Sequence, residues 1–363
     1  MSTALVAPIA ASRTRARRSW LAVAAGAIAL AALAVVSLGI GAVEIAPGRV
    51  VAILSAEAGL PAPGLAAADA DVVSRQRAVL VAIRAPRVLA AVLIGATLAV
   101  SGAALQGLFR NPLAGPALVG VSSGAALATA ATIVLGAQTA SLWLRPAGAF
   151  LGSVAATAVV YALATRNRRT DVATLLLAGV AINALAGAGN GVFTFVADDA
   201  QLRDITFWAL GSLGGITWSS LAVTGPVMAL GVVLLPRLAR ALNSLLLGER
   251  EAAHIGTNVQ LVKMASVAMV AAGVGAAVSI SGVIGFVGLV APHLVRLSIG
   301  PDHRTLIPGA AVIGAVLLLL ADLVSRTVVA PAELPIGIVT ALVGGPFFVW
   351  LLLRRRARGV SYA

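Results

Sequence analysis

Few side chains in this sequence could perform catalysis or hold a metal ion. The chain of 363 residues has no cysteine, and its three histidines, His254, His293 and His303, lack the spacing that places two ligands on one helix face. We interpret each histidine as structural. Lys263 is the only lysine, and it follows Val262 instead of the glycine that a P-loop needs. We therefore expect no catalytic residue, no metal site and no cofactor in this chain.

Asp322 is the main ionisable residue within an apolar run, near the outer end of that run. Secondary transporters and proton pumps usually couple through ionisable groups inside the bundle. If the protein moves a solute uphill, its energy should therefore come from a separate subunit. An ion-coupled transporter or channel is kept as the alternative of another class. A membrane enzyme is disfavoured, because no paired carboxylates or nucleophile and base fall together in the sequence.

The composition indicates a membrane protein. Hydrophobic residues make up 60% of the chain and charged residues 11%, and the mean hydropathy is +1.02. Soluble domains carry about 25% charged residues. The net charge of +13 would ordinarily suggest nucleic acid as a partner. Here the basic residues lie between apolar runs, which favours a lipid bilayer and membrane orientation, with no nucleic-acid partner.

The apolar runs predict ten transmembrane helices in an all-α fold. Met264–Val295 would be about 48 Å long as one helix, against a hydrocarbon core of about 30 Å. It should therefore break near Ser279–Gly282. Ile205–Pro236 should divide at Gly211–Gly215 into a short helix and a full span. The helix that follows Asn111 should begin near Ala117, after a loop with proline and glycine.

The basic residues predict the orientation. With the N-terminus inside, most of the 26 basic residues and few of the 13 acidic ones fall on the cytoplasmic side, so both termini should be cytoplasmic. The resulting organisation is a basic tail at 1–18, a single transmembrane domain at 19–353 and a basic tail at 354–363. Within the domain we expect a periplasmic loop at about 44–83 and a cytoplasmic loop at about 242–259.

Several stretches resemble one transporter family. Residues Ile83–Ala130, beginning IRAPRVLAAV and including LFRNPLAGPALVG, closely resemble the FecCD-type permeases of ATP-driven importers for iron-siderophores, haem and cobalamin. The other matches follow in family order between about residues 80 and 356: LLLAGVAINAL (175–185), FWALGSLGG (207–215), LLLGEREAAHIGTNV (245–259), GFVGLVAPHLVR (285–296), GPDHRTLIPGA (300–310) and ELPIGIVTALVGGPFFVWLLLRR (333–355).

The resemblance implies a type II ABC importer permease fold, with ten helices per subunit and a homodimer whose pathway lies on its two-fold axis. It also implies a multi-pass location in the bacterial inner membrane. The expected partners are a second copy of the chain, two cytoplasmic ATPase subunits that bind ATP and Mg²⁺, and a periplasmic substrate-binding protein. The chain itself would then be a transport subunit and not an enzyme.

Three arginines match the family's docking residues for the binding protein. Arg84 and Arg87 match an R-x-P-R pair, and Arg326 matches the arginine of an A-D-x-x-x-R stretch. In the family these arginines receive glutamates from the two lobes of the binding protein. A guanidinium group suits this role because it pairs with carboxylates in a bidentate geometry and stays charged. The alternative is that these arginines only mark the membrane interface.

The segment at 245–259 resembles the family's coupling helices, which sit in a groove on the ATPase. The matching residues are Leu247, Gly248, Glu249 and Gly256. A plain connecting loop would explain the polarity of this segment but not the match.

Asn111 and Leu113, in the stretch RNPLA, match part of the family's cytoplasmic gate, and a simple turn is the alternative. The family's usual acidic residue before the second proline is Gly115 here, so an acid-dependent contact is not expected in this loop.

The stretch Ala197–Phe207 resembles that of haem-importing members, so haem is the expected substrate, followed by a ferric siderophore and then cobalamin. Within it, Arg203 should lie at the periplasmic mouth of the path. Two copies of Arg203 at the two-fold axis could pair with the two propionates of haem. The alternative is a local ion pair with Asp199 or Asp204.

Overall fold

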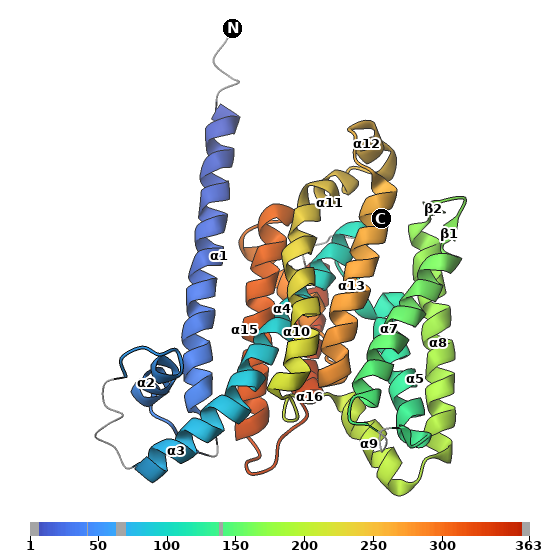
Figure 1. Ribbon diagram of the computed structural model, residues 1–363. Coiled ribbons are helices and arrows are strands. Elements are labelled where there is room, and N and C mark those ends of the chain that lie inside the picture. Colours follow the sequence, from blue (N-terminus) through green and yellow to red (C-terminus); the bar gives the residue numbers. More distant parts are fainter. Residues whose placement is uncertain (1–6, 42, 63–69, 138–140, 358–363) are drawn as a thin grey trace.

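The structure is a computed structural model, and it describes residues 7–41, 43–62, 70–137 and 141–357. The described residues form a bundle of helices with one short hairpin, in which β1 (Thr165–Arg166) pairs antiparallel with β2 (Arg169–Thr170) (Figure 1). We call the two ends of this bundle the α12 end and the α9 end. The α12 end also holds the hairpin and the start of α1, and the α9 end also holds α2 and α3 (Figure 1).

The helices agree with the ten expected spans. Seven are long and apolar enough to cross a membrane, and three shorter apolar helices complete the set. The spanning helices are α1 (Ala7–Gly39), α4 (Ala85–Phe109), α5 (Val121–Val134), α7 (Leu144–Leu163), α8 (Val172–Val196), α10 (Trp218–Leu234), α13 (Val259–Ser281), α14 (Val287–Ser298), α15 (His303–Thr327) and α16 (Ile336–Ala357).

Both expected helix breaks are present, and they pack against each other. α13 ends before Gly282, and the short helix α9 (Asp199–Leu210) ends before Gly211; both glycines have positive φ, 68° and 74°. A Cβ on Gly282 would lie only 2.1 Å from the carbonyl oxygen of Trp208. The amide of Ser212 donates to the carbonyl of Ser281 at 2.8 Å. At Gly211 and Gly282 the irregular backbone is therefore covered by protein, as membrane depth requires.

Two segments expected to be loops contain helices. Residues 44–83 include α2 (Pro47–Glu57), α3 (Ala70–Ala78) and most of a π-helical turn, η1 (Val79–Arg84), so that α3, η1 and α4 form one continuous helix. The stretch around 242–259 holds α11 (Ala239–Leu245) and α12 (Glu249–His254), and the 3-10 turn η3 (Leu235–Leu238) joins α10 to α11.

The helix after Asn111 also begins later than expected. A 3-10 turn, η2 (Pro116–Val119), and a left-handed Gly120 precede α5, which starts at Val121.

Glycines let the central helices approach closely. α4 lies in the middle of the bundle and crosses α15 where Gly95 faces Gly314; a Cβ on either would lie 2.4 Å from the other's carbonyl oxygen. α5 crosses α7 in the same way at Gly124 and Gly152. Small residues of this kind replace the hydrophobic effect as the basis of helix packing within a membrane.

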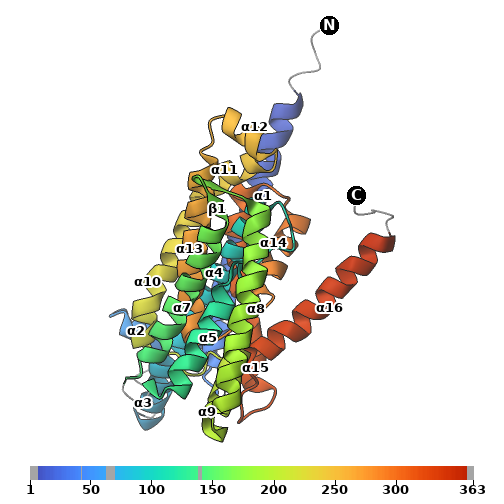
Figure 2. The same ribbon diagram turned by 90° about the vertical axis from the view of Figure 1, so that its right-hand side faces the viewer.

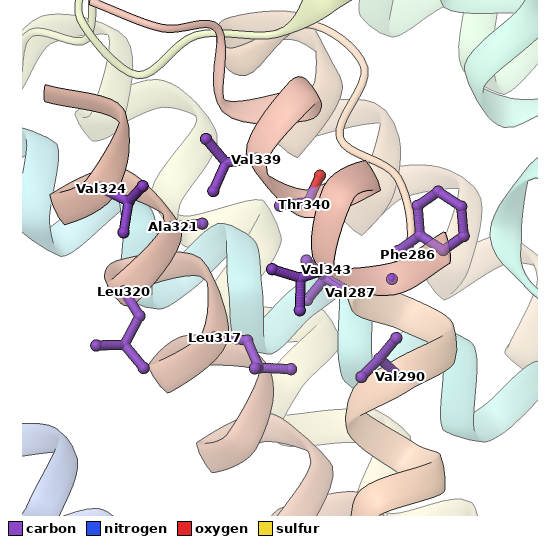
Figure 3. Close-up of a pocket in the computed structure, with 11 residues that line it drawn as sticks. Phe286, Val287, Val290, Leu317, Leu320, Ala321, Val324, Val339, Thr340 and Val343 are labelled. Atoms are coloured by element: carbon purple, nitrogen blue, oxygen red, sulfur yellow. The ribbon is translucent and has the colours of Figure 1, made fainter. Parts of the chain in front are cut away.

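α16 diverges from the rest of the bundle along its length (Figure 2). Near its start it packs against α14 and α15, where an apolar pocket opens between the three helices (Figure 3). The ring of Phe286 stands against Gly344, since a Cβ there would lie 2.3 Å from the ring. The side chains that line the pocket come mainly from Phe286, Val290, Leu317, Leu320, Val339 and Val343.

Candidate functional site

A cluster of two buried arginines, one buried carboxylate and one half-exposed carboxylate lies at the α9 end. Nε of Arg87, at the start of α4, lies 2.8 Å from Oδ1 of Asp322 on α15, and its Nη1 lies 2.6 Å from Oε1 of Glu333, which precedes α16. Nε of Arg326 lies 3.6 Å from Oδ2 of Asp322. The side chain of Asp322 is fully buried, whereas that of Glu333 is 42% exposed. The cluster balances its charges and ties α4, α15 and the segment before α16 together.

The structure buries all three arginines expected at the docking surface. Arg84 is 5% exposed, and its guanidinium group donates to the carbonyls of Leu38 and Gly39, the last residues of α1, and of Val43. Arg326 also donates to the carbonyl of Ser37. The three guanidinium groups therefore have partners within the chain, and docking through them stays a prediction. Sequence reasoning missed Glu333, although it lies in a matching stretch.

The residues expected to couple to an ATPase lie around α12. Leu247 is 68% exposed and Gly248 precedes the helix with φ of 125°. Glu249 is the first residue of α12. Gly256 follows the helix with φ of 88°, and a Cβ there would meet no other atom within 4 Å. Since Ile255 is also 63% exposed, apolar side chains flank both ends of this short charged helix.

Lys263 pairs with Glu249 of α12, a contact that sequence reasoning missed. Its Nζ lies 2.6 Å from Oε1 of Glu249 and donates to the carbonyl oxygen of Thr170 on β2 at 2.6 Å. In the sequence Lys263 excludes a P-loop and counts among the basic residues that predict the cytoplasmic side, but no partner is predicted for it. Its being the single lysine was the available signal, but its partners are 14 and 93 positions away.

The predicted gate loop is held by hydrogen bonds at the α12 side of α4. Oδ1 of Asn111 accepts from the amide of Leu113 at 2.9 Å, which is an Asx turn. Leu113 is 46% exposed. Nδ2 of Asn183, on α8, donates to the carbonyl of Ala117 at 3.0 Å, and Asn183 also accepts from Ser123. Asn183 lies in the family-matching stretch at 175–185, but the sequence alone predicts no role for it.

Arg203 lies on α9 with its side chain exposed. Among residues 7–41, 43–62, 70–137 and 141–357 we find no ion pair of this guanidinium group, so the local pairing with Asp199 or Asp204 is not observed there. Phe207, one helical turn later, is 58% exposed. Because positions i and i+4 share a helix face, Arg203 and Phe207 present a cation and an aromatic ring side by side.

The histidines occupy separate environments. Nδ1 of His303 lies 2.7 Å from Oδ1 of Asn243, and the ring of His293 packs edge-on to that of Phe347 at 5.8 Å. Both are buried, whereas His254 is exposed on α12. Within the described residues, no three histidine or carboxylate side chains come together as a metal site would require.

Comparison with known proteins shows the family. The model of the FecCD transport family matches residues 29–354. The chain belongs to the FecCD transport family. It is 51% identical over 277 residues to the hemin transport system permease protein HmuU of Yersinia pestis, covering 76% of this chain and 83% of that protein. It is 41% identical over 338 residues to the cobalamin import system permease protein BtuC of Halobacterium salinarum, covering 92% and 90%.

A solved structure supports the same conclusion for the fold. An inward-facing metal-chelate type ABC transporter matches with a TM-score of 0.79 and 32% identity, over 92% of this chain and 98% of that chain. The FecCD family resemblance and the type II permease fold expected from the sequence are thus confirmed. The FecCD chain is a multi-pass membrane permease of an ABC importer, a class that works with an ATPase and a binding protein. The ion-coupled alternative has no support.

Proposed function

We propose that this permease imports haem, which it receives from a periplasmic binding protein and releases to the cytoplasm. The observation that carries this proposal is the 51% identity to a hemin transport permease, against 41% to a cobalamin permease. ATP and Mg²⁺ would bind to separate ATPase subunits, and haem would be cargo and not a resident cofactor. The α12 end, with both termini, would face the cytoplasm.

The substrate path would use the exposed face of α9. Arg203 offers a cation for a propionate, and Phe207 offers a ring for stacking against the porphyrin. Phe195, at the neighbouring end of α8, is 89% exposed and extends the apolar surface. These side chains are exposed and would touch haem without coordinating its iron, which suits a substrate that must pass through the protein and be released.

A second copy of the chain would complete the path. On α8, a Cβ on Gly187 or Gly191 would meet no atom within 4 Å, unlike the glycines that pack inside the protomer. We infer that this face of α8, together with the divergent α16, contacts the partner copy. Because the chain has no cysteine, Gly187→Cys and Gly191→Cys each introduce a single thiol, with Leu163→Cys on exposed α7 as the control. Disulfide-linked dimers should form at α8 and not at the control.

The α9 end would bind the binding protein, and the α12 end the ATPase. At the α9 end, carboxylates of the binding protein would have to replace acceptors that Arg84, Arg87 and Arg326 already have. Arg87 is best placed for this exchange because its partner Glu333 is half-exposed. At the α12 end, Leu247, Gly248, Glu249 and Gly256 would form the ATPase contact, and Asn111 with Leu113 would close the cytoplasmic mouth.

The test is uptake by the complex reconstituted in proteoliposomes with its ATPase and binding protein, with haem, a ferric siderophore and cobalamin compared directly. Arg203→Ala should reduce haem uptake about tenfold, because a charge-assisted hydrogen bond contributes about 1.5 kcal/mol. Arg145→Ala, on α7, is the control for loss of one arginine. Siderophore uptake without haem uptake would contradict the assignment of haem as the substrate. Normal haem uptake by Arg203→Ala would show that Arg203 is not part of the substrate path.

One observation favours cobalamin as an alternative substrate. The cobalamin permease of Halobacterium salinarum aligns with 92% of this chain, including regions outside the 76% that the hemin permease covers. Cobalamin uptake that exceeds haem uptake in the same assay would favour it.

A further inference from the structure

The ammonium group of Lys263 lies in the protein interior and joins three segments of the α12 end. Lys263 is one turn into α13 and is 1% exposed. It contacts the carboxylate of Glu249 on α12 and the backbone carbonyl of Thr170 on β2. Because a buried charge without partners is strongly unfavourable, these oxygens fix the position of the ammonium group. Every other basic residue of the chain is an arginine.

The hairpin is firmly attached to α13. The amide of Thr170 donates to Oε1 of Gln260 at 3.0 Å, next to the bond from Lys263 to the carbonyl of the same residue. The hydroxyl of Thr170 lies 3.1 Å from that of Tyr161. At the tip, Asn167 and Arg168 both have positive φ, 51° and 60°, as in a tight two-residue turn that matches the twist of the strands. The hairpin should therefore move with α13.

The start of α8 adjoins the same ammonium group. Asp171, the residue after β2, caps α8 by accepting from the amide and hydroxyl of Thr174, each at 2.7 Å. These hydrogen bonds, and more weakly the charge of Lys263, hold the pKa of Asp171 below its usual value. A shift of Lys263 would thus act on the first turn of α8, and the other end of α8 leads directly to α9 and Arg203.

α12 has one polar side-chain contact with another element in the described part of the chain, the pair of Glu249 with Lys263. The side chain of Glu249 is 41% exposed and belongs to the segment that an ATPase would contact. We propose that Lys263 is a positioning residue that transmits movement of α12 to the hairpin and to the start of α8. This inference rests on the proposed function, in which the ATPase binds α12.

A lysine suits this role better than an arginine would. An ammonium group is compact and has three rotatable donors, so it reaches a carboxylate and a carbonyl that approach from different directions. A planar guanidinium group presents its donors in one plane and needs more space. Lys263→Arg should therefore restore only part of the effect of losing the lysine.

The experiment measures haem transported per ATP hydrolysed in proteoliposomes that hold the whole complex. Lys263→Met should lower this ratio about tenfold, within the range by which single residues on a coupling network change coupling. Glu249→Gln should lower it less, and the double variant should be no worse than Lys263→Met. Arg168→Met is the matched control, because it removes one positive charge from the exposed tip of the same hairpin.

The ratio separates positioning from mere stability, since loss of folded protein lowers transport and hydrolysis together. Hydrogen exchange at the Thr165–Thr170 amides, with and without a non-hydrolysable ATP analogue, is the second measurement. The analogue should change exchange there in the unmodified complex and not in Lys263→Met. If the unmodified complex is active and Lys263→Met keeps the normal ratio of haem transported per ATP hydrolysed, this inference is wrong. If Lys263→Met does not fold, a normal ratio for Glu249→Gln has the same meaning. A chain that binds no ATPase would instead refute the proposed function.

Discussion

The two ends of the bundle contain similar ion pairs that differ in the second partner of the buried cation. At each end a buried cation on a transmembrane helix holds a half-exposed carboxylate of a connecting segment: Arg87 holds Glu333, and Lys263 holds Glu249. The exposed fractions of the two carboxylates are nearly equal, 42% and 41%. The difference lies in the second partner. Arg87 has the buried carboxylate of Asp322, whereas Lys263 has a backbone carbonyl.

The second partner determines what happens when the exposed carboxylate leaves. Without Glu333, Arg87 would still pair with the buried carboxylate of Asp322, so the α9 end should keep its structure while its surface changes. Without Glu249, Lys263 would keep a neutral carbonyl and only the more distant charge of Asp171. This difference supports the proposals that Arg87 exchanges one carboxylate partner for another at the α9 end and that Lys263 responds to movement of α12 at the other end.

Removal of the shared buried carboxylate should have the largest effect. Asp322→Asn leaves Arg326 without its carboxylate partner and leaves Arg87 with Glu333 alone. Breaking a buried ion pair in this way costs about 3–5 kcal/mol. The variant should lose most of its thermal stability in detergent, measured by size-exclusion after heating. Glu333→Gln is the control and should change stability by less than about 1 kcal/mol, since Glu333 is half-exposed. Equal stability of the two variants would show that Asp322 and Glu333 do not differ in how much they stabilise the fold.

Gly256→Trp should have the next largest effect, at the α12 end. The structure leaves open space at this position, so a bulky side chain would meet no atom of the protomer itself. Both Gly256→Ala and Gly256→Trp impose the strain of a positive φ, about 1–2 kcal/mol. Only the tryptophan should block ATPase binding. Co-purification of the ATPase with the alanine variant and not with the tryptophan variant is the expected result. Normal assembly and transport by Gly256→Trp would make this segment a linker.

Glu333→Gln should have the smallest effect, and in the opposite direction. If docking places a carboxylate of the binding protein on Arg87, loss of the internal competitor should tighten docking about two- to fivefold. Surface plasmon resonance with the permease in nanodiscs measures this affinity. Glu44→Gln, an exposed carboxylate at the same end, provides the control for a change in net charge. Weaker docking by Glu333→Gln alone would show that Glu333 itself contacts the partner and that Arg87 does not exchange.

The sequence predicts the transmembrane part of the fold because its signals are local. Run length and glycine position are sufficient to locate the break at Gly282 and the division at Gly211. The same reasoning treats 44–83 as a loop, since α2 is short and α3 is polar and joins α4 through a π-helical turn. Neither has the long apolar run on which the prediction of spans depends.

The candidate site is less predictable, because its contacts join distant positions. Arg84 matches a docking motif, but its burial follows from the chain reversal after α1, where three carbonyls converge on it. Residue type identifies Arg87 as a partner for carboxylates without showing that Asp322 and Glu333 already supply them. Lys263 can be identified from the sequence as the single lysine. Its proposed role, however, depends on contacts that α12 and β2 make near the start of α13.

The burial of the only lysine gives the protein an unusual chemical property. Amine-reactive reagents such as N-hydroxysuccinimide esters modify accessible lysines and the N-terminal amino group. In the folded permease Lys263 is 1% exposed and its Nζ is bound to two oxygens, so it should be protected from such reagents. The rate at which one acyl group is added at Lys263 would therefore measure how often α12 separates from α13. A single mass shift, located by peptide mapping, would follow that opening without any engineered label.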